Sequence, residues 1–130
     1  IRAYKPCDSE TLIIVEEPES HLHPYAHAQV AQLFCDSLSI DKNKKYLIET
    51  HSQNFVLRIR RLIAEGKLNP DDFALYYVDF NEDNNESELK RIIVHDGGNV
   101  DFWPEGIFGE SVIEARAIMN ANINDLKNVD

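Results

Sequence analysis

Two adjacent carboxylates follow the most continuous apolar run near the start of the chain. Residues 11–15 read TLIIV, and Glu16, Glu17 and Pro18 come next. A run of this kind predicts a strand buried on both faces, as in the centre of a parallel sheet. Ionised side chains are costly inside such a core, so Glu16 and Glu17 are expected at its edge. Two acids at the carboxyl edge of an α/β sheet can hold a hard cation and orient a water molecule.

An imidazole follows a second predicted strand. His51 comes directly after the segment 46–49, YLIE, with only Thr50 between them. About 30 residues separate the two strands, and they include a predicted helix that begins near Pro24 or Tyr25. This strand–helix–strand path predicts parallel strands joined by a right-handed crossover. Glu17 and His51 should therefore share one edge of the sheet, although 34 positions separate them.

Helical spacing of apolar residues indicates the elements that hold this edge. The first helix should bury one stripe, formed by Ala26, Val30, Leu33, Phe34 and Leu38. A second helix is predicted from Ser52 or Gln53 to about Glu65, followed by Gly66. Its expected buried face consists of Phe55, Val56, Ile59, Leu62 and Ile63.

The C-terminal half has a different pattern. Segments 73–80 and 88–95 alternate in polarity and predict an antiparallel hairpin that extends the sheet. A last helix is expected over 110–121, with a docking face of Val112, Ala115, Ile118 and Met119, and residues 122–130 are expected to fray. We assign residues 1–96 to one domain and residues 97–130 to an aromatic linker with its helix.

Composition limits the function classes. The 130 residues carry 13 basic and 23 acidic side chains, a net charge of −10, which argues against a general nucleic-acid clamp in this segment. No run of 18 apolar residues is present, so no spanning helix and no membrane partner are expected. Two cysteines without a secretory signal favour the cytoplasm, and Cys35 is expected to be a buried free thiol.

Three stretches carry a family resemblance. Residues 11–24, TLIIVEEPESHLHP, resemble the Walker B strand and D-loop of ABC/SMC-type ATPases, in the form common among overcoming-lysogenisation-defect (OLD)-like and related predicted AAA ATPases. Residues 46–54, YLIETHSQN, resemble the strand and switch histidine of the same proteins. Residues 102–110, FWPEGIFGE, are similar to a small domain of unknown function that often follows such cores. The implied fold is α/β: the C-terminal lobe of a P-loop ABC/SMC-like ATPase, with a parallel βαβ unit, the hairpin and a C-terminal helix.

The resemblance also implies roles for individual residues. Glu16 would lie near the Mg²⁺ of bound ATP, Glu17 would be the base that polarises the attacking water, and His51 would contact the γ-phosphate. Glu19, Ser20 and His21 occupy the D-loop position, which in such dimers reaches the nucleotide site of the opposite subunit. Implied partners are ATP, a second copy joined through the ATPase heads, and an effector nuclease or toxin in a bacterial defence or DNA-maintenance system.

One part of a nucleotide site is missing from the sequence. A phosphate-binding loop needs the pattern G-x-x-x-x-G-K-[ST], whose backbone amides and lysine hold the phosphates. The glycines stand at positions 66, 97, 98, 106 and 109, and none fits that pattern. We therefore expect the loop to come from an upstream segment or another chain, and the 130 residues alone to be inactive.

Alternative interpretations remain open. The chain can be a non-catalytic partner-binding module that uses its acidic surface and the aromatic segment 102–108. His21, His23 and His27, with Glu19, can gather around zinc. A third possibility is a nuclease-type metal cluster of Asp79, Glu82 and Asp83, although a solvated turn is the stronger expectation for these three acids.

Overall fold

The structure is a computed structural model that describes residues 9–127, except the side chains of Glu110, Ser111 and Asp125. The described chain divides into two compact units. The first unit contains residues up to 75 together with 93–101, and the second contains 76–92 and the residues from 102 onward. Each unit is described below by itself.

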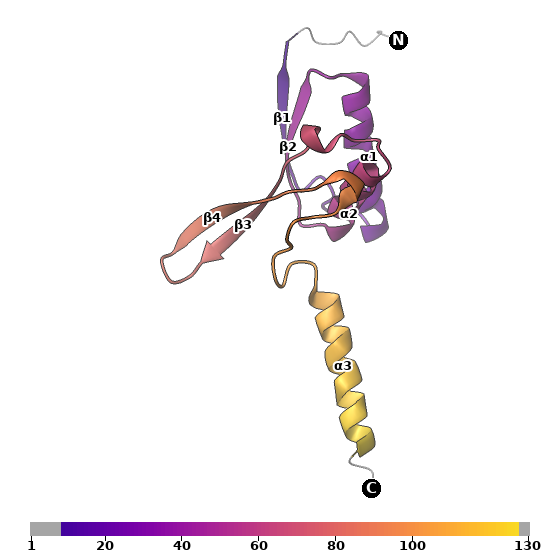
Figure 1. Cartoon of the computed structure of the whole chain (residues 1–130), viewed down its shortest axis with the longest axis vertical. Coiled ribbons are helices and arrows are strands. Elements are labelled where there is room, and N and C mark those ends of the chain that lie inside the picture. Colours follow the sequence, from indigo (N-terminus) through magenta and orange to yellow (C-terminus); the bar gives the residue numbers. More distant parts are fainter. Residues whose placement is uncertain (1–8, 128–130) are drawn as a thin grey trace. The chain divides into compact units, whose positions relative to one another are not determined.

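The first unit is built on the predicted strand–helix–strand path. Strand β1 (Thr11–Glu16) pairs in parallel with β2 (Lys44–Glu49), from Thr11 opposite Lys44 to Glu16 opposite Glu49. Helix α1 (Pro24–Ile40) connects them, and α2 (Gln53–Ala64) follows β2 (Figure 1). The parallel βαβ unit predicted from the sequence is therefore confirmed.

Helix α1 begins at a proline and buries a stripe that only partly matches the predicted one. The His23 ring caps it, because its Nδ1 accepts a hydrogen bond from the Tyr25 backbone N–H at 3.2 Å. Ala31 and Cys35 are its buried residues, with Val30 and Phe34 packed beside them. The prediction for Leu33 is wrong: this residue is 67% exposed, because it lies on the side of the helix away from Ala31 and Cys35.

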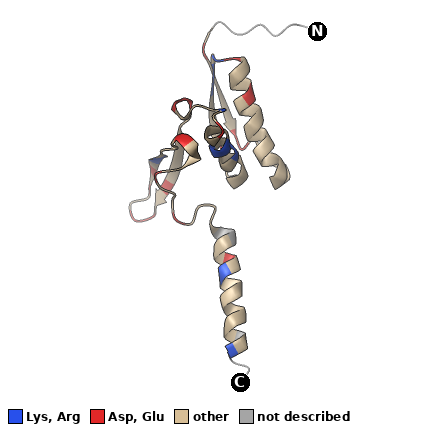
Figure 2. Ribbon diagram, turned by 45° about the vertical axis from the view of Figure 1, so that its right-hand side comes forward, with Lys and Arg blue, Asp and Glu red and all other residues tan. Residues whose placement is uncertain are grey.

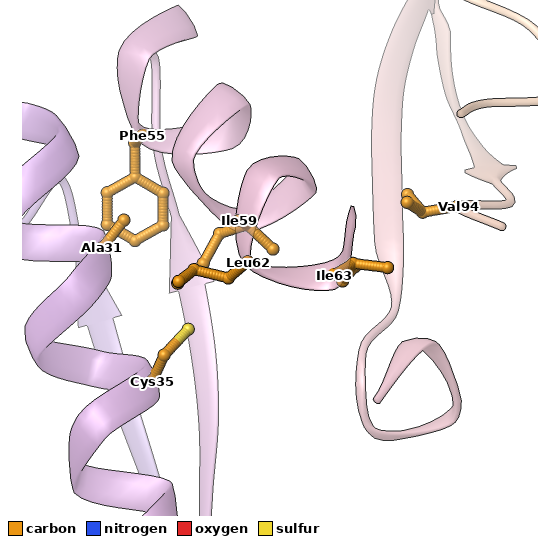
Figure 3. Packing of buried hydrophobic residues seen from close by; sticks show 7 residues of the cluster. All are labelled: Ala31, Cys35, Phe55, Ile59, Leu62, Ile63 and Val94. Atoms are coloured by element: carbon orange, nitrogen blue, oxygen red, sulfur yellow. The ribbon is translucent and has the colours of Figure 1, made fainter. Parts of the chain in front are cut away.

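Helix α2 agrees with its sequence pattern throughout. The Ser52 hydroxyl caps its start by accepting a hydrogen bond from the Phe55 N–H at 3.1 Å. All five residues of the predicted face are buried, and Gly66 follows the helix with a left-handed φ of +70°. The core of the unit joins α1, α2 and the segment after the hairpin (Figure 3), and its buried members are Ala31, Cys35, Phe55, Ile59, Leu62, Ile63 and Val94.

Cys35 lies within this core as a free thiol, as predicted. Burial raises the pKa of its thiol to about 11, and the neighbouring charge of Asp36 adds to the increase. A thiol with such a pKa carries almost no thiolate at neutral pH, which makes it a poor nucleophile and metal ligand. Cys35 is therefore a packing residue.

Only one face of the parallel pair is covered in the described chain. Alternate residues of a strand point to opposite faces, and those of β1 and β2 alternate between half-buried and exposed. Ile48 packs on the core, whereas Leu12, Ile14 and Leu47 are 60%, 66% and 58% exposed. The expectation that this strand pair is buried on both faces is wrong for the residues described, because α1 and α2 pack together on the core side.

Two short 3-10 turns belong to the first unit. The turn η1 (Pro70–Asp72) precedes the hairpin, with the Asn69 side chain accepting a hydrogen bond from the Asp71 N–H at 2.9 Å. The turn η2 (Asp96–Gly98) follows the hairpin and packs against α2, where the Arg60 Nε donates to the Gly98 carbonyl at 2.8 Å. The first of these contacts is local to its turn, whereas the second joins η2 to α2 within the first unit.

The second unit contains the hairpin and the last helix. Strands β3 (Leu75–Asn81) and β4 (Glu86–Ile92) form a two-stranded sheet of their own, so the expectation that they extend the β1–β2 sheet is wrong for the described residues.

Helix α3 (Glu110–Lys127) is longer than predicted, since residues 122–127 continue it and do not fray, while residues 128–130, for which fraying was also expected, lie outside the described residues. Ile123 and Leu126 extend the helical apolar spacing through this asparagine-rich end. Charged side chains are sparse along α3 (Figure 2), and the predicted docking-face residues Val112, Ile118 and Met119 are exposed. Within residues 9–127, no helix is long and apolar enough to span a bilayer.

Candidate active site at the carboxyl edge of the parallel strands

Two loops leave the same edge of the parallel pair. Residues 17–23 follow β1, and residues 50–52 follow β2. The strands end together, with Glu16 opposite Glu49, and the Glu17 backbone N–H then donates to the Glu49 carbonyl at 2.8 Å. The loops 17–23 and 50–52 therefore begin side by side at this edge.

Glu17 and His51 face each other across this edge. The Oε1 of Glu17 lies 3.3 Å from the Nε2 of His51, and the Oε1 of Glu49 lies 3.6 Å from the same nitrogen. The predicted proximity of Glu17 and His51 is confirmed. Their catalytic roles stay predictions, because proximity alone does not establish them.

Solvent exposure shows that this group is not held for stability. The side chains of His51, Glu17 and Glu49 are 73%, 50% and 63% exposed. Ion pairs between groups this exposed are screened by water and contribute about 0–1 kcal/mol to folding. Glu17 also has a left-handed φ of +43°, a conformation that costs free energy in a residue with a side chain and clusters at functional sites. These three groups are exposed, and Glu17 lies on a strained turn, so a bound molecule can reach them.

Glu19 lies on the same turn, but its side chain is buried. The residue is 5% exposed, and its Oε1 accepts two hydrogen bonds, from the Thr50 hydroxyl at 2.6 Å and the His51 backbone N–H at 3.0 Å. Its Oε2 is enclosed without a hydrogen-bond partner among the described residues. The sequence prediction assigned Glu19 to nucleotide contact, which stays untested, and it did not foresee this bond to the histidine loop.

His27 of α1 is a second link between the two loops. Its Nε2 lies 3.1 Å from the Leu22 carbonyl, which can only accept, so Nε2 carries the hydrogen. In the neutral ring Nδ1 then accepts from the Ser52 hydroxyl at 2.8 Å, while the Ser52 oxygen accepts from the Phe55 N–H. His27 thereby connects the end of the β1 loop to the cap of α2, a role that sequence spacing did not indicate.

These contacts argue against zinc. His23 caps α1, His27 is shared between Leu22 and Ser52, and Glu19 is bonded to Thr50 and His51. Across residues 9–127, no three His, Cys, Asp or Glu side chains gather in a way that could hold a metal ion. The zinc alternative is therefore wrong for the described residues, because His23, His27 and Glu19 have other hydrogen-bond partners and no metal-binding group forms around them.

The other predicted site residues lie at the surface of this edge. Glu16, Ser20 and His21 are exposed. The Ser20 N–H donates to the Glu17 carbonyl at 2.9 Å, and His21 has a left-handed φ of +66°, so both belong to the compact turn after β1. Glu16 offers carboxylate oxygens, the type of ligand that Mg²⁺ prefers. Its metal role, like the nucleotide contacts of Ser20 and His21, stays a prediction.

Two of the three hairpin acids lie in its turn. Asp79 pairs with Lys90 across the strands at 2.7 Å, and its hydrogen bond to the Lys90 ammonium holds the pKa of Asp79 below its usual range. Glu82 and Asp83 are exposed in the connecting loop. The expectation of a solvated turn is confirmed for Glu82 and Asp83 and is wrong for Asp79, which lies within strand β3 and pairs with Lys90 of β4.

Two family models match this chain, one over its N-terminal part and one over its C-terminal part. Residues 2–58 match a family model described as "AAA domain, putative AbiEii toxin, Type IV TA system". Residues 68–118 match one described as "Protein of unknown function (DUF3696)". No curated protein and no solved structure matches the chain at a significant level. The first match, which covers both β1 and β2, supports an AAA-type ATPase segment at the N-terminal end of this chain, followed by a domain of unknown function.

Proposed function

We propose that this chain supplies the water-activating half of an ABC/SMC-type ATPase head, which binds ATP with Mg²⁺ and hydrolyses it. One observation carries the proposal: Glu17 and His51 lie 3.3 Å apart at the carboxyl edge of two adjoining parallel strands. Ligands of open α/β sheets bind at such edges. The family match over residues 2–58 supports the nucleotide-binding class.

Glu17 is the proposed general base. Its carboxylate is half exposed, so a water molecule can reach it, and an ionised carboxylate can take a proton from that water as the water attacks. Glu16 immediately precedes it and would hold the metal through its oxygen atoms, directly or through water. The chemistry that Mg²⁺ would supply there is neutralisation of the negative charge on the phosphates.

His51 is proposed to contact the terminal phosphate. Its Nε2 faces two carboxylate oxygens, which accept hydrogen bonds when ionised, so the nitrogen must carry its hydrogen to interact with them. The same N–H can donate to a phosphate oxygen. Glu49 then keeps the imidazole at the edge, while Ser20 and His21 extend the surface that meets the nucleotide.

The assembly and the process are further parts of the proposal. The turn at 17–23 is exposed at Ser20, His21 and Leu22, so it can meet a second ATPase head. We propose a homodimer through these heads that acts with an effector nuclease or toxin. The description of the matched family, a putative AbiEii toxin of a type IV TA system, is the support for the proposed defence role.

Reconstitution tests the ATPase proposal. We expect no ATP turnover by the 130-residue chain alone, because it has no loop to cradle the phosphates. Turnover should appear when the chain is joined to the segment or subunit that carries a phosphate-binding loop, and removal of Mg²⁺ by EDTA should abolish it. ATP turnover would be measured as phosphate release with a coupled colorimetric assay. We call this chain, together with the segment or subunit that carries the phosphate-binding loop, the complete protein. Equal turnover by the 130-residue chain alone, or none by the complete protein, would contradict the proposal.

A partner-binding module is the second candidate, and the hairpin favours it. Because the Asp79–Lys90 contact places those two residues on one face, strand alternation places Tyr76, Val78, Phe80 and Leu89 on the other. These four side chains are 50%, 60%, 55% and 63% exposed. An apolar sheet face of this kind is typical of an interaction surface. For a module without catalysis, Glu17 and His51 substitutions would leave the activity of the complete protein unchanged.

A further inference from the structure

We infer that Glu19 is a positioning residue, which fixes the His51 loop to the turn that carries Glu17. The inference rests on the proposed function and adds to it a residue that holds the base and the histidine in register. Glu19 does not touch the reacting atoms in this assignment. It acts through the backbone of residues 50–52.

One carboxylate oxygen organises the whole loop after β2. The Oε1 of Glu19 accepts from the Thr50 hydroxyl and from the His51 backbone N–H, at 2.6 and 3.0 Å. The Thr50 oxygen in turn accepts from the Ser52 backbone N–H at 3.1 Å. All three loop residues are thus bound, directly or through Thr50, to a single atom of the β1 turn.

The turn that presents Glu19 also presents Glu17. The Ser20 N–H donates to the Glu17 carbonyl at 2.9 Å, and the Leu22 N–H donates to the Glu19 carbonyl at 3.1 Å. Two overlapping turns therefore connect the proposed base to the buried carboxyl. Through this turn and the bonds of Glu19, the backbone that carries Glu17 is connected to the backbone of His51.

Burial energetics favour a positioning role over a stabilising one. Glu19 is 5% exposed, and its Oε2 is enclosed without a partner among the described residues. Enclosing a carboxyl oxygen in this way costs free energy, which an apolar residue at the same place would avoid. Local choices that oppose stability are expected where geometry serves function. Glu19 positions the loop after β2 through its two hydrogen bonds at Oε1.

Variants of Thr50 and Glu19 separate positioning from simple folding. Thr50→Val removes the hydroxyl but keeps the shape, whereas Thr50→Ser keeps the hydroxyl and is the matched control. Glu19→Ala removes both hydrogen bonds at Oε1. In the complete protein, we expect Thr50→Val and Glu19→Ala to lower kcat for ATP by about 10–100-fold with little change in KM, because a small misplacement of a catalytic group has effects of that order. Thr50→Ser should stay close to wild type.

Amide hydrogen exchange of His51 in the 130-residue chain provides a readout independent of ATP hydrolysis. Loss of its acceptor should speed exchange at His51 by about tenfold or more in Glu19→Ala, while the α2 core amides keep their protection. Should Glu19→Ala fail to fold, Thr50→Val gives the same comparison through Ser52, whose N–H loses its acceptor.

The outcomes distinguish this inference from the proposed function. If Glu17→Gln abolishes turnover while both Glu19→Ala and Thr50→Val keep wild-type kcat and exchange, the positioning role is overturned and the ATPase proposal stands. If exchange responds as expected but Glu17→Gln leaves turnover unchanged, Glu19 still orders the loop and the assigned base is wrong.

Discussion

Glu17→Gln is expected to lower the rate of ATP hydrolysis in the complete protein by about 10²–10⁴-fold, the usual contribution of a general base. Glutamine has nearly the same size as glutamate but cannot take a proton from water. Nucleotide binding should persist, because Glu16 and the phosphate-binding loop are unchanged. The variant should therefore retain ATP and prolong the dimer, which single-turnover hydrolysis and size-exclusion chromatography with ATP can measure.

Glu49→Gln is the matched control for this prediction. Glu49 contacts the same His51 nitrogen, at 3.6 Å instead of 3.3 Å, and its side chain is similarly exposed. Since Glu49 is proposed to hold the histidine and not to act on water, its loss should slow hydrolysis by no more than about tenfold, which is below the 10²–10⁴-fold contribution of a general base. Unchanged hydrolysis in Glu17→Gln would refute the base assignment, and a larger loss in Glu49→Gln would transfer it to Glu49.

Gly98→Ala is expected to destabilise the first unit by about 2–4 kcal/mol, the combined cost of a left-handed alanine and an overpacked contact. Gly98 has a φ of +75°, and a Cβ atom there would lie 2.4 Å from the Arg60 carbonyl oxygen. That oxygen belongs to the backbone of α2, and the Arg60 side chain already bonds to the Gly98 carbonyl at 2.8 Å. Relief of the clash would require η2 to move away from the helix.

Gly97→Ala separates the two contributions. Gly97 has a similar φ of +80°, but an added Cβ would meet only the Asn99 Nδ2, at 3.8 Å. We expect a loss of about 1 kcal/mol, from backbone strain alone. Hydrogen exchange of the α2 amides under increasing urea reports on the first unit specifically. Equal losses for the two variants would show that the close approach of Gly98 to α2 does not exist.

The elements of the first unit could be predicted because their sequence periods are distinct. The apolar spacing of α2 identified its five buried residues without error, since its polar and apolar faces are cleanly separated. In α1 the apolar residues cover a wider arc, so the pattern could not show that Leu33 would be exposed. The apolar run of β1 likewise could not reveal that only one face is covered in the described chain. The hairpin was recognised from alternation, but alternation does not say which sheet a strand joins.

For the candidate site, the sequence predicted that two functional residues lie together, but not the hydrogen bonds that hold their loops. Parallel topology alone brings Glu17 and His51 to one edge, and the structure confirms it. The inward position of Glu19 and the bridge through His27 depend on the turn after β1, with left-handed residues at Glu17 and His21. Side-chain-bearing residues rarely adopt that conformation, so no residue type in the sequence signals it.

A double-mutant cycle tests most directly whether Glu17 and His51 act as one site. Hydrolysis of Mg²⁺-ATP would be measured in the complete protein for wild type, Glu17→Gln, His51→Ala and the double variant. Groups that act as a unit lose their effects non-additively. We expect the double variant to be about as slow as the slower single variant. Losses that multiply fully, as for independent residues, would contradict a shared site at the edge of β1 and β2.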